Sequence, residues 1–450
     1  MAAAPGLSPA AARESGPRVG VHLGLAEALA AVPELRAAWD DAWAAGAHPR
    51  GAAVVQAAVD CRRAGLRRPL SQSLLRELHR PYLLARGHDL QTEPFSEAIT
   101  WACGPAHAPG SLLTGDHIQG YRAYAPLLTT PHPEPHPHPV PEHLWRTLLA
   151  RATPEDAYDM GLLAHQQRHP RRAAEALTRA GLGRVPGADY LLALTIGDAG
   201  RPHRAAADLA GIVRRRQNRL GPHHPDTLAA RHQLAHFTAE AGNPHAAAAR
   251  FAALAADAAA VLGPDHPDTL AARHALAHCT GQAGAPAEAA RQLERLLADL
   301  LRVQRPQDPA VLATRRGLLW YRGGDPSRTT IQLTELLADT LHYLGPDNPH
   351  TLAVRSTQAT FTSRTGRTTE AAAAWQTLVA DRARVLGPDH PHTIHTRLEW
   401  AHALATANRP TEARTLLTHT LTAPHPLLEP GHRHLRRARD LLTTLPTDNT

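Results

Sequence analysis

The sequence contains no lysine, so all of its 48 basic residues are arginine. A Walker A phosphate-binding loop requires a lysine, and so does an enzyme that forms a Schiff base with its substrate. Both classes are therefore excluded. No GxSxG motif of a serine hydrolase occurs either. We expect a protein that is not an enzyme, with no catalytic residues and no cofactor.

Cysteine is also scarce. Cys61, Cys103 and Cys279 are widely separated and odd in number, so they form neither a disulfide framework nor a CxxC zinc site. This usage fits a reducing cytoplasm. Residues 1–18 are rich in Ala, Pro, Ser and Gly and lack the charged and apolar regions of a signal peptide, so we expect them to be disordered. No apolar run approaches membrane-spanning length, and we expect no membrane association.

Aromatic residues make up only 4% of the chain, which argues against a β-sandwich or barrel. Alanine, arginine and leucine are abundant instead, and these are strong helix formers. A length of 450 residues favours several units or an elongated array over one compact core. The net charge of +7 permits nucleic-acid contact, but the arginines are scattered among 41 acidic residues, so a nucleic-acid partner is not favoured.

An internal repeat dominates the last two thirds of the sequence. The motif Leu-Gly-Pro-His-His-Pro-Asp-Thr-Leu at 220–228 recurs at 262–270, 344–352 and 386–394. A worn copy occupies 304–312, and a weaker one begins at Leu428. Successive copies start 42 residues apart, with one step of 40.

Each copy predicts two helices and two turns. Gly221 and its equivalents suit a left-handed residue that closes a helix, and Pro225 suits the first turn of the next helix. Of the residues before that proline, Asn348 and Asp308 are good N-caps, whereas histidines are poor ones. A second turn at Gly242, followed by a small and then a bulky residue, predicts two closely packed helices per repeat.

These units resemble tetratricopeptide repeats of the kinesin-light-chain-like subtype, whose hallmark is LGPDHPDTL followed by a G…EA inner turn. The resemblance covers residues 186–446, and weaker units precede it at 154–182 and 187–220. It implies an all-α fold: a right-handed α-solenoid of about seven helical hairpins and a C-terminal capping helix, spanning 142–446.

The first third of the chain lacks the period. Helical stretches are predicted at 23–45, 50–64, 71–86 and 95–103, and a β-hairpin at 111–124. Residues 19–128 therefore predict a mostly helical, winged-helix-like domain. A Pro/His-rich linker follows at 129–141.

The segment 49–128 also resembles the region after the ATPase core of bacterial STAND-type signalling proteins. The matching residues are Ala57–Asp60 with Arg62–Gly65, then Glu93–Phe95 with Ala98 and Trp101, and finally Gly120–Arg122. No P-loop precedes the segment, so an ATPase role does not carry over.

In a solenoid of helical hairpins, the first helices line a concave surface where partners bind. Helical spacing from the last motif residue predicts the groove residues, of which Trp320 is the best anchor candidate. They are His232, His236, Glu240, His274, His278, Gln282, Arg316, Trp320, Ser356, Thr360, Arg364 and His402. In the subtype, an asparagine five residues after the motif leucine often clamps a peptide backbone. This chain has Gln233, Ala275, Gly317, Thr357 and Glu399 there, which makes a folded partner as plausible as an extended peptide.

Two histidine pairs, His232/His236 and His274/His278, have the i, i+4 spacing of zinc-binding helices. No third ligand accompanies them, so a polar groove lining is favoured and no metal is predicted. The linker histidines His132, His136 and His138 allow at most loose metal uptake. One arginine three residues after each motif leucine faces the neighbouring helix, where structural pairing with a carboxylate or with helix-end carbonyls is expected rather than ligand binding. These arginines are Arg231, Arg273, Arg315, Arg355 and Arg397.

Three functions remain open from the sequence. The first is a non-enzymatic scaffold that binds a partner protein or peptide in the concave groove. The second is the sensor or regulatory half of a STAND-type system that lacks its own ATPase. The third is a regulator that contacts DNA through residues 50–128. The oligomeric state is not predicted.

Overall fold

A computed structural model describes residues 32–44, 46–87, 92–104, 110–129, 140–167, 169–423 and 432–446. The expected N-terminal disorder, the linker histidines and the weak motif copy at 428–431 lie outside these residues. Contacts divide the chain between Ala188 and Asp189 into two compact units. We refer to the described residues of these units as the N-terminal unit (32–188) and the repeat unit (189–446). The predicted domain limits stay predictions.

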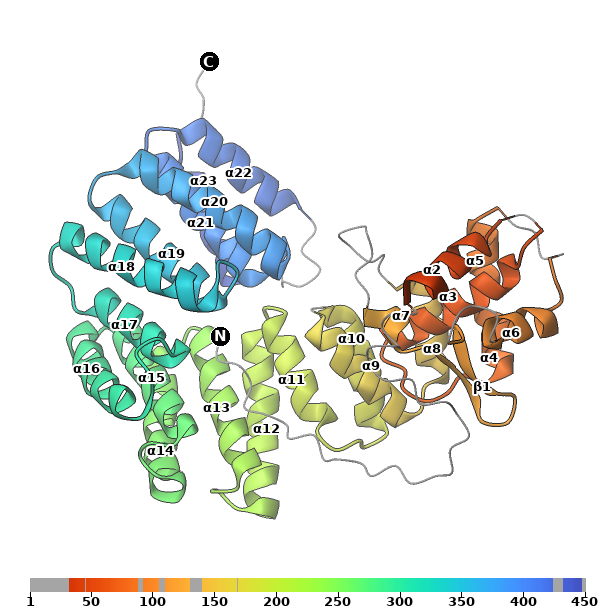
Figure 1. Cartoon of the computed structure of the whole chain (residues 1–450). Helices are drawn as coiled ribbons and strands as arrows, with labels where there is room; N and C mark the ends of the chain where they lie inside the picture. The colour runs from red at the N-terminus through yellow and green to blue at the C-terminus, as the bar shows by residue number, and fades with distance from the viewer. Residues whose placement is uncertain are drawn as a thin grey trace. The chain divides into compact units, whose positions relative to one another are not determined.

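The repeat unit is a stack of antiparallel helix pairs, as Figure 1 shows from green to blue. It confirms the all-α solenoid of tetratricopeptide type. Its helices are α11 (Ala188–Asp198), α12 (Pro202–Leu220), α13 (Pro225–Glu240), α14 (Pro244–Leu262), α15 (Pro267–Gln282), α16 (Pro286–Val303), α17 (Pro309–Tyr321), α18 (Pro326–Leu344), α19 (Pro349–Arg364), α20 (Thr368–Leu386), α21 (Pro391–Thr406), α22 (Pro410–Thr422) and α23 (Arg433–Thr444).

The repeated motif forms the turn between successive helix pairs. Its glycines have positive φ, as predicted, but Gly263, with φ 100° and ψ 159°, is extended rather than left-handed helical. The histidine before the proline caps the next helix, contrary to expectation: the Nδ1 of His266 accepts the backbone N–H of Asp268 at 3.2 Å. Asp308, expected to be a good cap, instead accepts the N–H of Arg305 at 3.1 Å. An imidazole nitrogen can thus replace the usual capping oxygen.

In three copies the motif threonine secures the same turn, whereas the buried hydroxyl of Thr227 in the first copy has no hydrogen-bond partner. The hydroxyls of Thr269, Thr351 and Thr393 each donate to the carbonyl of the motif glycine, at 2.9, 2.8 and 2.9 Å. These threonines are buried. A buried hydroxyl needs a partner, and the carbonyl at the end of a helix needs a donor, so one bond satisfies both groups.

The predicted arginine pairing is confirmed in four repeats. The four pairs join the first and second helices of one repeat: Arg231–Asp257 at 2.7 Å, Arg273–Asp299 at 2.7 Å, Arg315–Asp339 at 2.9 Å and Arg355–Asp381 at 2.6 Å. The series stops in the last repeat, because the position equivalent to Asp381 is Ala423. These arginines are therefore structural.

Each core cluster draws on more than one helix pair. Phe251 of α14, for example, is buried between α13 and α15, where it meets Leu228 and Cys279. First helices also contact the first helices of neighbouring repeats, α13 with α15, α15 with α17 and α17 with α19. The first helices therefore form a continuous layer, whose exposed side we call the inner face.

One irregularity lies in this layer. α17 has 13 residues, whereas α13, α15, α19 and α21 have 16. The shortening agrees with the two residues missing from the motif spacing.

α14 is a second deviation from expectation, because it is long and apolar enough by composition to span a membrane. Its alanine content produces this property, and the helix packs against α13 and α15.

The N-terminal unit contains α2 (Val32–Asp41), α3 (Pro49–Arg63), α4 (Gln72–Leu78), α5 (Arg80–Ala85), α6 (Phe95–Cys103), β1 (Leu113–Asp116), β2 (Gly120–Ala123), α7 (Pro126–Thr129), α8 (Glu142–Arg151), α9 (Pro154–Gln166) and α10 (Pro170–Leu182). The hairpin is confirmed, with Leu113 opposite Ala123. The helix expected over 71–86 is two helices, because Pro81 starts a new first turn. Buried Asp60 holds α3 to α5 by accepting the Tyr82 hydroxyl at 2.8 Å.

A close contact between first helices gives a stability prediction. A Cβ at Gly281 in α15 would overlap the ring of Tyr321 in α17. Gly281→Ala should therefore lower the free energy of unfolding by about 1–2 kcal/mol, since overpacking outweighs the gain in helix propensity. Gly211→Ala in α12 is the matched control, because only the flexible Arg215 side chain lies within 4 Å.

Urea denaturation of both variants checks this. The control should be unchanged or stabilised by up to about 1 kcal/mol. An equally stable Gly281→Ala variant would show that the two first helices are less tightly packed than described.

Candidate functional site

The inner face carries two clusters of side chains, one between α15 and α17 and one between α17 and α19. Two further contacts join the first helices α13 and α21 to α23. The first cluster joins α15 and α17. The rings of His274 and His278 lie 4.7 Å apart, and His278 lies 5.4 Å from Tyr321. The Tyr321 hydroxyl donates to the His278 carbonyl at 3.1 Å, and the His278 Nδ1 is 3.2 Å from the same hydroxyl. When the Tyr321 hydroxyl donates its proton to the carbonyl, it can only accept a hydrogen bond from Nδ1. The ring proton of His278 then lies on Nδ1. The Nε2 atoms of both histidines are buried without a hydrogen-bond partner.

The second cluster joins α17 and α19 around Trp320. Trp320 is 36% exposed, its ring centre lies 6.0 Å from that of Phe361 with the two rings nearly perpendicular, and the Arg364 guanidinium lies over the indole at 5.2 Å. The same guanidinium lies 4.7 Å from the Phe361 ring centre. Cation–π contacts hold these three side chains together. Trp320 thus both packs between repeats and presents part of its surface to solvent.

Tyr321 and Phe361 were not predicted as site residues. Both lie nine residues after the motif leucine, where Phe237 occupies the equivalent position in an earlier repeat. This shared register is the sequence signal that could have identified them, because it recurs with the same period as the motif.

Glu240 forms an ion pair with α23, the last helix of the repeat unit. Its carboxylate accepts Arg433 of α23 at 2.5 Å, although the two residues are 193 positions apart. The first turn of α23 therefore approaches the C-terminal end of α13, on the inner side of the repeat unit. A partner would meet an ion pair there rather than a free glutamate.

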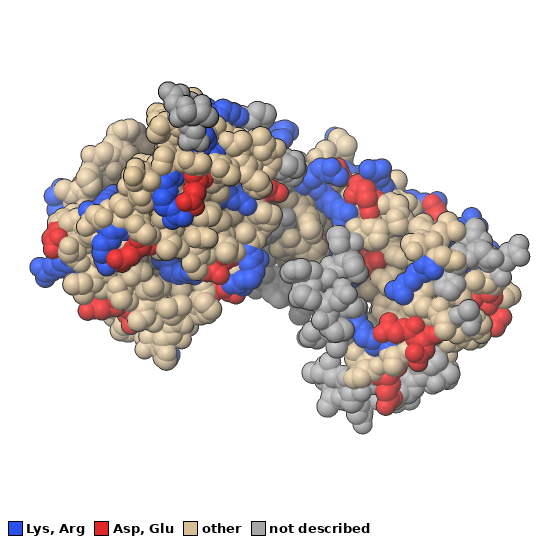
Figure 2. Space-filling model, turned by 90° about the horizontal axis from the view of Figure 1, so that it is seen from above, with Lys and Arg blue, Asp and Glu red and all other residues tan. Residues whose placement is uncertain are grey.

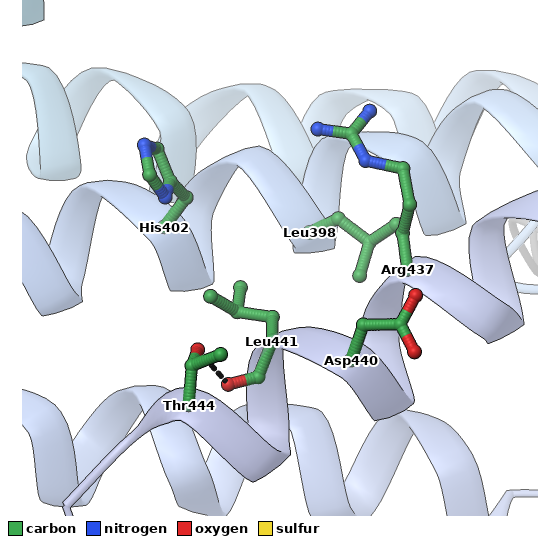
Figure 3. Close-up of a pocket in the computed structure, with 6 residues that line it drawn as sticks. All are labelled: Leu398, His402, Arg437, Asp440, Leu441 and Thr444. Carbon is green, nitrogen blue, oxygen red and sulfur yellow. Dashed lines mark hydrogen bonds between the residues drawn. The ribbon is translucent and has the colours of Figure 1, made fainter.

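His402 lines a pocket between α21 and α23, shown in Figure 3, with a volume of about 270 Å³. Leu398 and Leu441 form its apolar part, and Arg437 and Asp440 its charged rim. Arg437 lies 3.5 Å from Glu399. α23 was predicted only as a cap, and it contributes most of this pocket.

The remaining predicted groove residues have local contacts. His232 packs edge-on against Phe251 at 5.2 Å, while His236 and Gln282 are exposed. The Thr360 hydroxyl donates to the Ser356 carbonyl at 3.0 Å, within the same helix. The structure thus brings together Trp320 and Arg364 on adjacent helices, and His274 with His278, while Arg316 contacts Thr357 instead. It places Glu240 and His402 beside α23.

Burial disfavours the charged form of the inner histidines. It is the main cause that lowers the pKa of His232, His274 and His350 to about 4 each, and it lowers that of His278 further. Among the described residues, no group of three His, Cys, Asp or Glu side chains could hold a metal ion. On the face visible in Figure 2, basic and acidic side chains are interspersed.

Comparison of the chain with protein-family models and solved structures gives matches to the repeats. Residues 227–268 and 351–392 match the tetratricopeptide repeat family model. No curated protein matches the chain. Among solved structures, TPR-like repeats described as those of a Podosopora anserina kinesin light chain are 27% identical, with a TM-score of 0.34. This match covers 44% of this chain and 94% of that one.

Two further structures show lower identity. A tetratricopeptide repeat protein from Parabacteroides merdae is 12% identical, with a TM-score of 0.42, and the match covers 64% of this chain and 97% of that one. A Rap protein complexed with competence and sporulation factor is 11% identical, with a TM-score of 0.34, covering 67% and 77%. The class defined by the fold and the family match is a tetratricopeptide-repeat solenoid. The resemblance of residues 49–128 to STAND-type proteins stays a prediction.

The buried histidines predict a loss of stability in acid. Their folded-state pKa values lie below the ordinary value near 6.5. Between about pH 6.5 and 4, the unfolded chain therefore binds more protons than the folded one, and stability falls as pH falls. We expect the free energy of unfolding to drop by more than about 2 kcal/mol from pH 7 to 5, at up to about 1.4 kcal/mol per pH unit for each histidine.

Urea denaturation at a series of pH values measures this. His274→Asn should make the dependence shallower, whereas the same change at exposed His245 of α14 should alter it less. A pH-independent stability between 7 and 5 would contradict the assignment of neutral, buried rings.

Proposed function

We propose that this chain is a non-enzymatic scaffold that binds a partner protein on the inner face of the repeat unit. The observation that carries the proposal is the Trp320, Phe361 and Arg364 cluster. It combines an exposed indole with a guanidinium at the irregular repeat, and tryptophan and arginine are frequent hot-spot residues. Phe361 packs against the ring in a T-shaped contact, so the anchor is ordered before a partner arrives, which reduces the entropy lost on binding.

Recognition does not use the asparagine clamp of the subtype. At the positions of that asparagine, Gly317 has no side chain and lies against His278, and the Thr357 hydroxyl donates to the Ala353 carbonyl at 3.0 Å. A folded partner read through side-chain contacts fits this surface better than an extended peptide held by its backbone.

The other functions receive less support. In the N-terminal unit, two of the arginines that could contact DNA already face carboxylates: Arg63 pairs with Asp60 at 2.8 Å and Arg68 with Asp156 at 2.7 Å. An arginine in such a pair is less available for a phosphate. A regulatory role beside a separate ATPase remains compatible with the scaffold, since its partner would be that second chain.

The proposal is tested by using the full chain as bait, identifying the partner by mass spectrometry and measuring the affinity of variants. Trp320→Ala should weaken binding by about 2 kcal/mol or more, roughly thirtyfold in Kd. Tyr343→Ala is the matched control, because this residue is an exposed aromatic, 53% accessible, on the second helix α18.

Melting temperatures of both variants are measured in parallel. If Trp320→Ala lowers the melting temperature and leaves the affinity unchanged, the ring is only a packing element between repeats. An effect of Tyr343→Ala alone would place the binding surface on the second helices.

A further inference from the structure

Two neighbouring arginines on α17 have opposite surroundings. Arg315 pairs with Asp339 at 2.9 Å, as its counterparts do in other repeats. Arg316 lies on the inner face, and its one side-chain hydrogen bond reaches the Thr357 hydroxyl at a long 3.5 Å. Within the part of the chain that the structure describes, no carboxylate pairs with the Arg316 guanidinium.

The groups around Arg316 add no negative charge. Its charge contributes to lowering the pKa of His274, His278, His350 and Arg382, although burial is the larger cause for each. These four side chains come from α15, α19 and α20, so cationic or neutral groups surround Arg316 on several sides. A partly buried guanidinium without a counter-charge costs stability.

The fold does not require an arginine at this position. Arg316 lies four residues after the motif leucine, where other repeats have His232, His274, Ser356 or Leu398. Arg316 lowers stability, and the repeat does not need it. Such a residue is expected where function requires it. The missing negative charge is then supplied by a ligand.

The Arg316 guanidinium has free hydrogen-bonding capacity. A guanidinium has five N–H donors, and Arg316 uses one of them weakly. The Nε2 atoms of His274 and His278 are fully buried, so the half-buried guanidinium is the donor that a ligand can reach. Its planar fork of donors suits a phosphate better than a carboxylate, because a phosphate group has more acceptor oxygens.

We propose that the inner face at α17 and α19 contains a phosphate-binding site in which Arg316 is the principal ligand. This inference rests on the proposed function in placing ligand recognition on the inner face. The phosphate belongs either to a small phosphorylated molecule or to a phosphorylated residue of the partner protein.

The test needs no partner. Inorganic phosphate is titrated into the full chain at constant ionic strength, with chloride as the balancing ion, while the melting temperature and the heat of binding are recorded. The wild type should show a saturable response. Arg316→Leu should weaken phosphate binding at least tenfold, whereas Arg315→Leu should lower the melting temperature and leave the phosphate Kd within twofold.

Stability without phosphate separates a ligand site from a structural arginine. Arg316→Leu should be at least as stable as the wild type in phosphate-free buffer, because it removes an uncompensated charge. A variant that unfolds, or that binds phosphate as the wild type does, would overturn the proposal. Arg316→Lys, which keeps the charge and loses the planar fork, should fold and bind phosphate several-fold more weakly.

Further arms identify the source of the group. Tighter binding of adenosine monophosphate than of inorganic phosphate assigns the site to a small molecule, and tighter binding of a phosphoserine peptide assigns it to a protein partner. Acetate binding as tightly as phosphate would contradict the phosphate assignment. Because the titration uses the chain alone, its failure leaves the Trp320 experiment unaffected, and the reverse also holds.

Discussion

Contact between successive helical hairpins is the constraint on which the rest of the repeat unit depends. One hairpin cannot enclose its own apolar side chains. Phe251 of α14 is therefore buried only because α15 of the next hairpin covers it together with α13. The motif turn sets the spacing of the hairpins through the threonine-to-glycine hydrogen bond and the histidine cap. Stacking then leaves one side of the first helices free, and this side is available for binding.

The repeat itself was readable from the sequence because its chemistry is local. Glycine, proline and the 42-residue period predicted the helix pairs, and the arginine series predicted the pairing with carboxylates. The details that failed depend on side-chain geometry. Histidine caps a helix through Nδ1, which capping preferences do not favour, and Pro81 divides a helix whose flanks both have helical composition.

The inner face was only partly predictable. Helical spacing placed Arg316, Trp320 and Arg364 on one side of their helices, but it carried no information on Phe361 against the indole or on Tyr321 against His278. The contact of Glu240 with Arg433 spans 193 residues. It depends on how the whole stack curves, and curvature is the sum of small rotations between repeats. A periodic sequence pattern does not specify that sum.

Two sets of arginines in the repeat unit differ in their partners. Four of the arginines that lie three residues after a motif leucine have carboxylate partners and hold their hairpins together. Arg316 on the inner face and buried Arg382 of α20 have hydroxyl or carbonyl partners instead, and burial lowers the pKa of both. A departure from the repeat pattern that brings no stability is expected at functional sites.

The central claim is that the inner face, rather than the outer one, meets the partner. Site-specific photo-crosslinking in cells tests it directly, with the crosslinking residue placed at exposed Gln282 on the first helix α15 or at exposed Leu301 on the second helix α16. The account predicts a discrete crosslinked protein from position 282, lost when Trp320 is replaced by alanine, and none from position 301. A discrete crosslink from position 301 with none from position 282 would contradict it.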